Sequence, residues 1–176
     1  MSTWYAVHTR SNFEPRVSGE LTLKGFESYL PVFQELHRWK DRTKLLDVPV
    51  FRSYVFARFE DNSESRLAVL RCQGAARILG ARDSITPVPE EEIEAVRRML
   101  SAAAARCLAH PLLRDGAWVR VKRGPLKNLE GLLVRAKNQT RLVVSVTLLS
   151  QSVSTEVGVG DVEFVRAGES AGRRVG

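Results

Sequence analysis

Residues 113–136, LRDGAWVRVKRGPLKNLEGLLVRA, carry the pattern that decides the fold of this chain. A run of β-formers leads to Gly124 and Pro125, a few polar residues follow, and a second run begins at Glu130 and Gly131. Glycines at both ends of a short connection suit a backbone that takes positive φ there. The stretch therefore predicts two strands joined by a short turn.

Two more β-type runs follow, RLVVSVTLL and STEVGVGDVEFV, and Gly, Asn and Pro separate the runs from one another. The first of them is dense in β-branched residues, which favour strands. Short strands with glycine-rich turns remove their exposed edges best by closing into a barrel. The sequence therefore predicts a small all-β barrel domain at residues 114–166, followed by a loose tail at 167–176.

The beginning of the chain has a different pattern, which combines a strand with a helix. The segment WYAVHT alternates and is rich in β-formers, which predicts a strand over residues 3–9. Ser11 precedes Glu14 by three positions, the spacing of a capping box, and Pro15 falls in the first turn of the helix that would follow. Gly25 is placed to end this helix. Its predicted apolar stripe consists of Phe13, Val17, Leu21 and Leu23.

More strands are predicted after this helix. ESYLPVFQEL, residues 27–36, is interpreted as one strand in which Pro31 favours an edge or bulge position. HRWKDRTKLLDVPVF, residues 37–51, is a basic segment followed by a return strand, and SYVFARFE, residues 53–60, continues as a strand. The next residues, 63–79, fit a short helix and then a strand that begins near Ala76.

A second clear helix is predicted within TPVPEEEIEAVRRMLSAAAARCL, residues 86–108. Pro89 and the glutamates open it, where the helix dipole favours negative charge. A proline and an Asp-Gly turn follow, so we place a linker at residues 106–113. The fold class is therefore α+β, with an N-terminal α/β domain at residues 1–105 and the β-barrel domain after the linker.

Composition and charge narrow the class of protein. Hydrophobic residues make up 44% of the chain and charged residues 27%, as in an ordinary globular protein. The beginning lacks the pattern of a secretory signal, and no apolar run is long enough to cross a bilayer, so a cytoplasmic location and no membrane partner are expected. The net charge of +7 makes nucleic acid or a ribonucleoprotein a plausible partner.

Motifs that carry bond chemistry are absent from the sequence. It contains no GxSxG, HExxH or phosphate-binding GxxxxGK[ST] pattern, and the lone GVG at residues 158–160 leads into a strand rather than a helix. The two cysteines and three histidines are scattered, without the spacing of metal ligands. We therefore expect no enzyme, no metal and no cofactor.

The barrel stretch resembles the KOW motif of NusG-family transcription factors and of some ribosomal proteins. The N-terminal half also resembles this family in three segments: the opening Trp-Tyr strand with its helix, DVPVFRSYVFARF, and the closing helix PVPEEEIEAV. The resemblance covers residues 3–165 and implies a NusG-type α/β sandwich followed by an SH3-like KOW barrel. The residues that match the KOW motif are Gly116, Val119, Val121, Gly124, Pro125 and Gly131.

The resemblance implies that RNA polymerase is the main partner. In the family, the first strand and an aromatic strand form an apolar depression that receives the clamp helices of the polymerase β′ subunit. Tyr54 and Phe56 share one face of their strand, so we expect them to form an exposed contact patch, whereas Phe51 and Trp4 are equally well explained as core. The candidate polymerase-binding residues are Trp4, Tyr5, Phe51, Tyr54 and Phe56.

A basic segment is the candidate nucleic-acid site. If HRWKDRTK forms a hairpin, its four cationic residues could share one face beside an indole, an arrangement that neutralises phosphates and stacks a base. In the family this region lies near the upstream DNA, although a solvated charged loop explains the same residues equally well. The candidates are Arg38, Trp39, Lys40, Arg42 and Lys44, with Arg10 and Arg16 as weaker candidates for the non-template DNA strand.

The last barrel loop bears on the role within the family. A housekeeping NusG usually has Phe-Gly-Arg there, where NusE of the ribosome or Rho binds, and this chain has Leu149, Ser150 and Gln151. The divergence is more similar to operon-specific antiterminators such as RfaH, UpxY and LoaP, although a general elongation factor or a KOW protein that binds RNA or ribosomes stays open. We expect a monomer with a stable barrel, although a switch of this domain to a helical hairpin, as in RfaH, stays open. The candidate KOW partner-binding residues are Leu148, Leu149 and Gln151.

Overall fold

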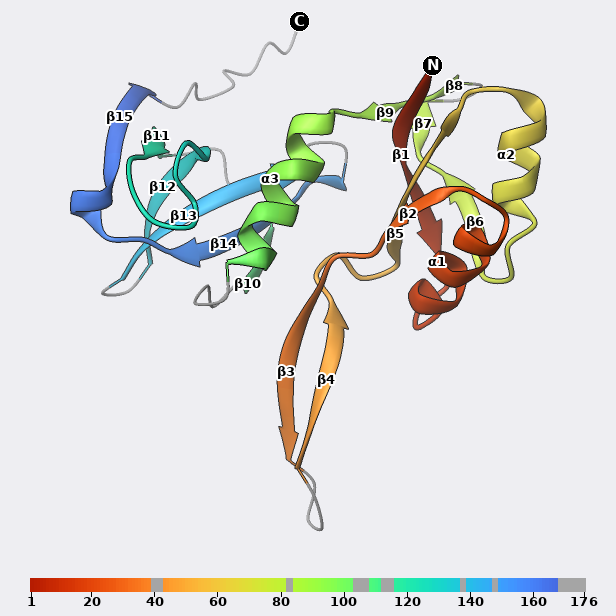
Figure 1. The fold of residues 1–176 in the computed structure, drawn as a ribbon, viewed down its shortest axis with the longest axis horizontal. Helices are drawn as coiled ribbons and strands as arrows, with labels where there is room; N and C mark the ends of the chain where they lie inside the picture. Colours follow the sequence, from red (N-terminus) through yellow and green to blue (C-terminus); the bar gives the residue numbers. More distant parts are fainter. Residues whose placement is uncertain are drawn as a thin grey trace, which may run out of the picture. The chain divides into compact units, whose positions relative to one another are not determined.

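The computed structural model of the chain describes residues 1–38, 43–81, 84–102, 108–111, 116–136, 139–146 and 149–167. They divide into two compact units, Met1–Glu90 and Glu91–Gly176. Helices and strands are mixed in the first unit, whereas the second combines one helix with a β-sheet, so the predicted α+β class is confirmed (Figure 1). No helix among the described residues is long and apolar enough to span a membrane.

The first unit is built on an antiparallel sheet with β1 at its centre (Figure 1). The strand order is β2-β5-β1-β6, and β9 also pairs with β1. The strands predicted at residues 3–9 and 53–60 are confirmed as β1 and β5. The bounds are Ser2–Thr9 for β1, Glu27–Tyr29 for β2, Tyr54–Glu60 for β5, Ala75–Ile78 for β6 and Pro87–Val88 for β9.

One face of this sheet packs against two helices, α1 (Glu14–Leu23) and α2 (Ser63–Leu70). Strands alternate their side chains between the two faces, so every second residue of β1 and β5 enters this core. The rings of Tyr5 and Phe59 lie 4.6 Å apart within it. The cluster of buried residues is Tyr5, Val7, Val17, Leu21, Val55, Ala57, Phe59, Val69 and Cys72.

Helix α1 begins differently from the prediction. Its N-cap residue is Phe13, and no side chain caps the first turn, so the predicted capping box of Ser11 and Glu14 is wrong. The Glu14 carboxylate instead accepts a hydrogen bond from the backbone N–H of Ser53, at 2.6 Å. A contact between distant segments has therefore replaced the local one that the spacing suggested.

The end of α1 is as predicted. Gly25 has φ of 84° and donates its N–H to the carbonyl of Thr22, while Phe26 donates to the carbonyl of Leu21. This is the Schellman motif, which glycine favours because it has no Cβ to clash at positive φ. Of the predicted stripe, Val17 and Leu21 are buried, but Leu23 is exposed.

Proline divides the strand that was predicted at residues 27–36. Its first part is β2 in the main sheet, and after Pro31 the chain enters β3 (Val32–Arg38). The strand β3 pairs with β4 (Thr43–Pro49) in a separate two-stranded sheet, the hairpin that extends from the unit in Figure 1. Pro31 has no N–H to donate, but its carbonyl accepts from the N–H of Val50 at the base of the hairpin.

The connection from α2 to the next helix contains the predicted strand, β6, and three short strands that were not predicted, β7 (Gly80–Ala81), β8 (Ser84–Ile85) and β9. Asn62 caps α2 by accepting from the N–H of Ser65 at 2.8 Å. After β6, the strands β7 and β8 form a small sheet of their own. Helix α3 (Glu90–Ser101) follows Pro89 and confirms the second predicted helix.

The second unit contains most of α3 and a six-stranded antiparallel sheet of order β10-β14-β13-β12-β11-β15. The four β-runs of the sequence supply five of these strands. β10 (Leu108–Pro111) lies inside the predicted linker, 106–113, but pairs with β14, so these four residues belong to the sheet. The other bounds are Ala117–Val121 for β11, Glu130–Ala136 for β12, Gln139–Val146 for β13, Gln151–Glu156 for β14 and Val162–Ala167 for β15.

The turn between β11 and β12 shows why glycines occur at its ends. Gly124 has φ of 82° and Asn128 has φ of 66°, both in the region that most side chains avoid. Gly131 is needed for another reason: an added Cβ would lie 2.5 Å from the carbonyl oxygen of Val143 on the neighbouring strand. The positive φ expected at both glycines is therefore confirmed only at Gly124.

Candidate functional site

The second face of the N-terminal sheet carries the predicted docking residues. The register of β1 against β5 pairs Trp4 with Arg58, Ala6 with Phe56, and His8 with Tyr54. Directly opposite residues of an antiparallel pair lie on the same face. We call this face, formed by Trp4, Ala6, His8, Tyr29, Tyr54, Phe56 and Arg58, the aromatic face.

The middle of the aromatic face is buried. Phe56 is 0% exposed, and its ring packs edge-on against Phe51 at 5.9 Å and beside Tyr29 at 6.3 Å. The prediction that Phe56 is an exposed contact residue is therefore wrong. Phe51 and Trp4 are also buried, at 1% each, in agreement with their interpretation as core.

A polar network closes the aromatic face at the Trp4 end. The indole N–H of Trp4 donates to a carboxylate oxygen of Glu90 at 3.1 Å. Arg58 lies 3.5 Å from the same carboxylate and 3.4 Å from that of Glu27, with its guanidinium 6.0 Å from the Trp4 ring. Tyr5 points to the opposite face and belongs to the core there. These contacts give Trp4 and Tyr5 structural roles in the unit.

The other end of the aromatic face is open to solvent. Tyr54 and His8 are half-buried, and their rings meet edge-on at 5.2 Å. Tyr54 directly follows a turn in which Ser53 has φ of 63°, a conformation that glycine would adopt without strain. The turn is held by two hydrogen bonds, from Ser53 N–H to Glu14 and from Thr9 N–H to the Ser53 carbonyl at 2.8 Å.

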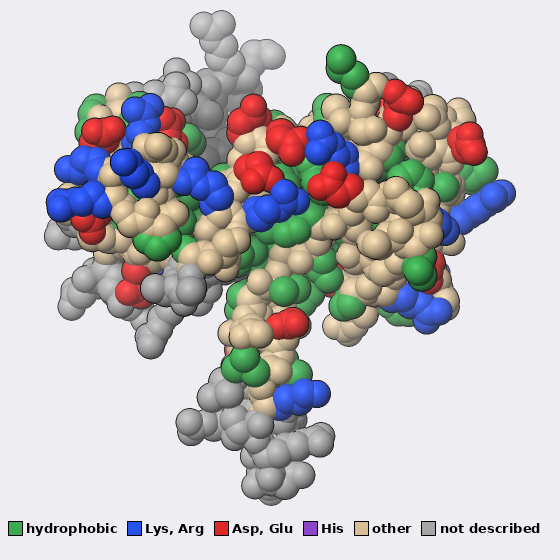
Figure 2. Space-filling view, viewed as in Figure 1, with side chains coloured by type: hydrophobic (Ala, Val, Ile, Leu, Met, Phe, Trp, Pro, Cys, Tyr) green, Lys and Arg blue, Asp and Glu red, His purple; other side chains and the backbone are tan. Residues whose placement is uncertain are grey.

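The nucleic-acid prediction requires a hairpin at the basic segment, and the structure confirms the hairpin. It does not place all the basic residues on one shared face. The register pairs position 38 with Thr43 and Lys44 with position 37, so positions 38 and 44 lie on opposite faces. Lys44 is exposed, and Figure 2 shows a basic side chain next to the grey end of the hairpin. Trp39, Lys40, Arg42 and the side chain of Arg38 lie outside the described part of the chain.

The two weaker nucleic-acid candidates differ in their surroundings. Arg10 is exposed, and among the described residues it makes no ion pair. Arg16 is also exposed but pairs with Glu20 at 3.3 Å. The backbone N–H of Gln73, and then the Arg16 guanidinium, lower the pKa of Glu20 below its ordinary value, so this carboxylate stays charged and compensates Arg16.

The three predicted partner-binding residues of the second unit differ in their surroundings. Leu149 is only 7% exposed, and Ser150 after it has φ of 52° in the tight turn that leads to β14. Gln151 is half-buried and pairs with Val146 of β13 and Pro111 of β10. Leu148 lies outside the described residues.

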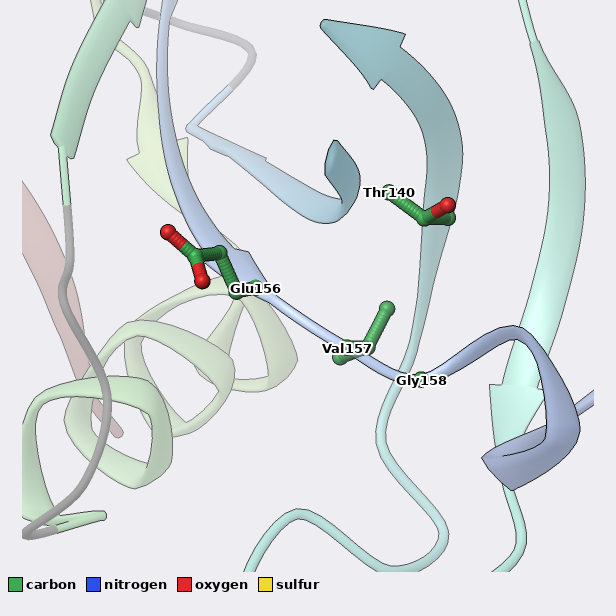
Figure 3. Close-up of a pocket in the computed structure, with 4 residues that line it drawn as sticks. All are labelled: Thr140, Glu156, Val157 and Gly158. Carbon is green, nitrogen blue, oxygen red and sulfur yellow. The ribbon is translucent and has the colours of Figure 1, made fainter. Parts of the chain in front are cut away.

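A shallow cavity of about 320 Å³ lies near this sheet and is lined by Thr140, Glu156, Val157 and Gly158 (Figure 3). Among the described residues that line it, the single charged side chain is Glu156, which already pairs with Arg141 at 3.4 Å. The described residues contain no cluster of His, Cys, Asp and Glu side chains that could hold a metal ion. The cavity therefore offers a ligand little beyond one engaged carboxylate.

Comparison with known proteins assigns the family. Residues 2–97 match the family described as "Transcription termination factor nusG". This chain belongs to the NusG family. Two curated relatives, both named "Transcription termination/antitermination protein NusG", come from Halalkalibacterium halodurans and Vibrio vulnificus. They are 26% and 25% identical to this chain. The alignments cover 92% and 91% of this chain, and 98% and 94% of the two relatives.

A solved structure is similar over the whole chain. The structure entitled "Domain interaction in Thermotoga maritima NusG" matches with a TM-score of 0.56 and 18% identity, and covers 94% of this chain and 98% of its own. At this identity the likeness concerns the fold alone. It agrees with a NusG-type N-terminal domain followed by a small KOW-like β region. The chain is thus a member of a family of transcription termination and antitermination factors.

Proposed function

We propose that this NusG-family protein binds the clamp helices of the RNA polymerase β′ subunit through the open end of its aromatic face. The observation that carries the proposal is the half-buried Tyr54–His8 pair, which lies on the same face of the sheet as the buried ring of Phe56. A partly exposed tyrosine on a rigid strand is a common anchor of protein interfaces. Phe56 supports this anchor and does not touch the partner.

The proposed effect on transcription is steric and needs no bond chemistry. A protein that binds only the closed state of the polymerase clamp shifts the clamp toward closure by its differential affinity. Pausing and termination that require an open clamp then become rarer, which promotes elongation and antitermination. The second unit, joined to the first through α3, would hold a further partner such as NusE or Rho at high effective concentration.

The binding prediction uses Tyr54→Ala in the full-length chain. We expect the wild type to bind a purified fragment that contains the β′ clamp helices, and the variant to bind at least about thirtyfold more weakly, because a truncated anchor costs 2 kcal/mol or more. Titration calorimetry gives the affinities. Arg71→Ala, a change of the exposed C-cap residue of α2, is the control and is expected to bind like the wild type.

Absence of any complex between the wild type and the fragment would contradict the proposed function. A complex that tolerates Tyr54→Ala would show that another surface docks. A structured ribosomal RNA fragment, tested in the same way, examines the other class of function, a KOW protein that binds RNA through basic residues without the polymerase.

We also propose that the protein acts on a small number of long operons. The support is the chemistry of the last barrel loop, where Leu149, Ser150 and Gln151 replace the Phe-Gly-Arg that binds general partners. Deletion of the gene is expected to lower the promoter-distal transcripts of a few long operons, as read by RNA sequencing. Uniform changes across the genome would favour a general NusG role. The names of the curated relatives fit this general role at least as well as the operon-specific one.

A further inference from the structure

Three exposed arginines belong to segments that meet at the open end of the aromatic face. The register places Tyr54 opposite His8 on one side of β1 and Arg77 opposite His8 on the other. The three residues therefore form a row across β5, β1 and β6 on one face of the sheet. The row joins segments that are far apart in the sequence, so neither pattern nor spacing reveals it.

The two other arginines border this row. Arg52 lies in the turn just before Ser53 and Tyr54, and Arg10 follows β1 two residues after His8. The strand end and the turn are held together, because Thr9 N–H donates to the Ser53 carbonyl. Arg10 itself donates its backbone N–H to the carbonyl of Gly74, next to the start of β6, at 2.8 Å. The backbone at each of the two positions is thus fixed beside the row.

These arginines are not used inside the protein. Arg10, Arg52 and Arg77 are all exposed, and none of them takes part in an ion pair within 4.0 Å among the residues that the structure describes. Three other arginines of the unit, by contrast, form ion pairs: Arg16 with Glu20, Arg58 with Glu27 and Glu90, and Arg66 with Asp61. The nearest carboxylate to the turn, that of Glu14, is 4% exposed and accepts from Ser53 N–H.

We propose that Arg10, Arg52 and Arg77 form a cationic rim that binds carboxylates of the segment that docks on Tyr54. The inference rests on the proposed docking function and adds the chemistry of its partner: an amphipathic helical segment with an apolar stripe and acidic residues beside it. The three cations border the aromatic anchor of the proposed docking site, so charge complementarity calls for acidic residues beside the apolar stripe of the partner that docks there. Cations beside an aromatic ring also hold a phosphate backbone and a base in other proteins, so nucleic acid is the second probe of the test.

Rim charges act mainly on association. Charged groups around an interface steer the encounter and make the rate depend on salt, while the buried anchor sets dissociation. Arginine also forms bidentate hydrogen bonds with carboxylates, so it supplies geometry in addition to charge. Loss of the rim should therefore slow association much more than it speeds dissociation, in contrast to loss of the Tyr54 ring.

The test compares Arg52→Ala/Arg77→Ala with the wild type, as full-length chains, against the β′ clamp-helix fragment. At low salt we expect association to be about tenfold slower, with a shallower dependence on ionic strength, as measured by stopped-flow or surface plasmon resonance. Arg52→Lys/Arg77→Lys keeps the charges and should recover most of the rate. Arg71→Ala, which removes an exposed charge at the C-cap of α2 in the same unit, should change neither quantity.

Each other outcome has a defined meaning. If the wild type binds the fragment and the double variant associates at the same rate, the rim is overturned while the docking function stands. If the wild type does not bind, both fail. A single-stranded oligodeoxynucleotide is the second probe: loss of its binding, with unchanged association to the fragment, would overturn the rim as a carboxylate site and assign it to nucleic acid.

Discussion

Phe56→Ala is expected to lower the free energy of unfolding of the N-terminal unit by about 3–5 kcal/mol. The side chain is completely buried and packs against Phe51 and Tyr29, so truncation leaves a cavity that the neighbouring rings cannot fill without moving. Domains are stable by only about 5–15 kcal/mol, so a loss of this size removes much of the margin. Hydrogen exchange of the β1 and β5 amides in the full-length chain measures this loss of unfolding free energy.

Tyr54→Ala is the matched comparison, two residues away on the same face of the same strand. Its ring is half-buried and has one aromatic neighbour, His8, so we expect a much smaller loss of stability than for Phe56→Ala. Phe56→Leu, which keeps most of the apolar volume, should fall between the two. A folded Phe56→Ala protein that has lost only its binding to the clamp-helix fragment would contradict the assignment of Phe56 to the interior.

This pair of residues shows how far a strand pattern can lead. Alternation correctly predicts that Tyr54 and Phe56 share a face, because the side-chain period of a strand is two. It does not reveal what covers that face. Phe51 and Tyr29 reach Phe56 from a turn and from another strand, and no local signal encodes those contacts. The sequence therefore identifies the face but not its buried part.

Other differences have the same origin in contacts between distant segments. Glu14 has the spacing of a capping residue, yet its carboxylate is used by the Ser53 turn. The residues of β10 resemble a linker because they include His110 and Pro111, and pairing with β14 makes them a strand. The role of Gly25 as the end of α1 was predictable, because the hydrogen bonds of the Schellman motif all lie within the last turn of the helix. Local chemistry could be predicted, whereas tertiary partners could not.

The candidate site follows the same rule. Tyr54 was found from its sequence motif, but its neighbour His8 and the rim residue Arg77 become neighbours only through the register across β1. The basic hairpin segment was the stronger candidate in the sequence because its cations alternate along one short stretch. Arg10, Arg52 and Arg77 are separated by long segments, and only the folded sheet gathers them.

In the second unit, Leu149→Ala is expected to lower the free energy of unfolding by about 2–5 kcal/mol. Leu149 occupies the position at which the family resemblance places a partner-binding aromatic residue, but it is only 7% exposed. Ser150 after it adopts φ of 52°, so the turn depends on packing of the leucine to hold a strained conformation. Hydrogen exchange of β13 and β14 in the full-length chain reports the loss.

Gln151→Ala is the control for this prediction, because the side chain is half-buried and should change stability by no more than about 0.5 kcal/mol. Leu149→Met keeps the volume and should cost less than about 1.5 kcal/mol. The decisive comparison adds binding to NusE and to Rho. A stable Leu149→Ala protein that loses one of these partners would make the leucine a contact residue, whereas an unstable one makes it core. In the second case Leu149 does not take over the contact that the aromatic residue makes in the general factors, because its side chain belongs to the interior, and a partner of this loop must bind through other residues.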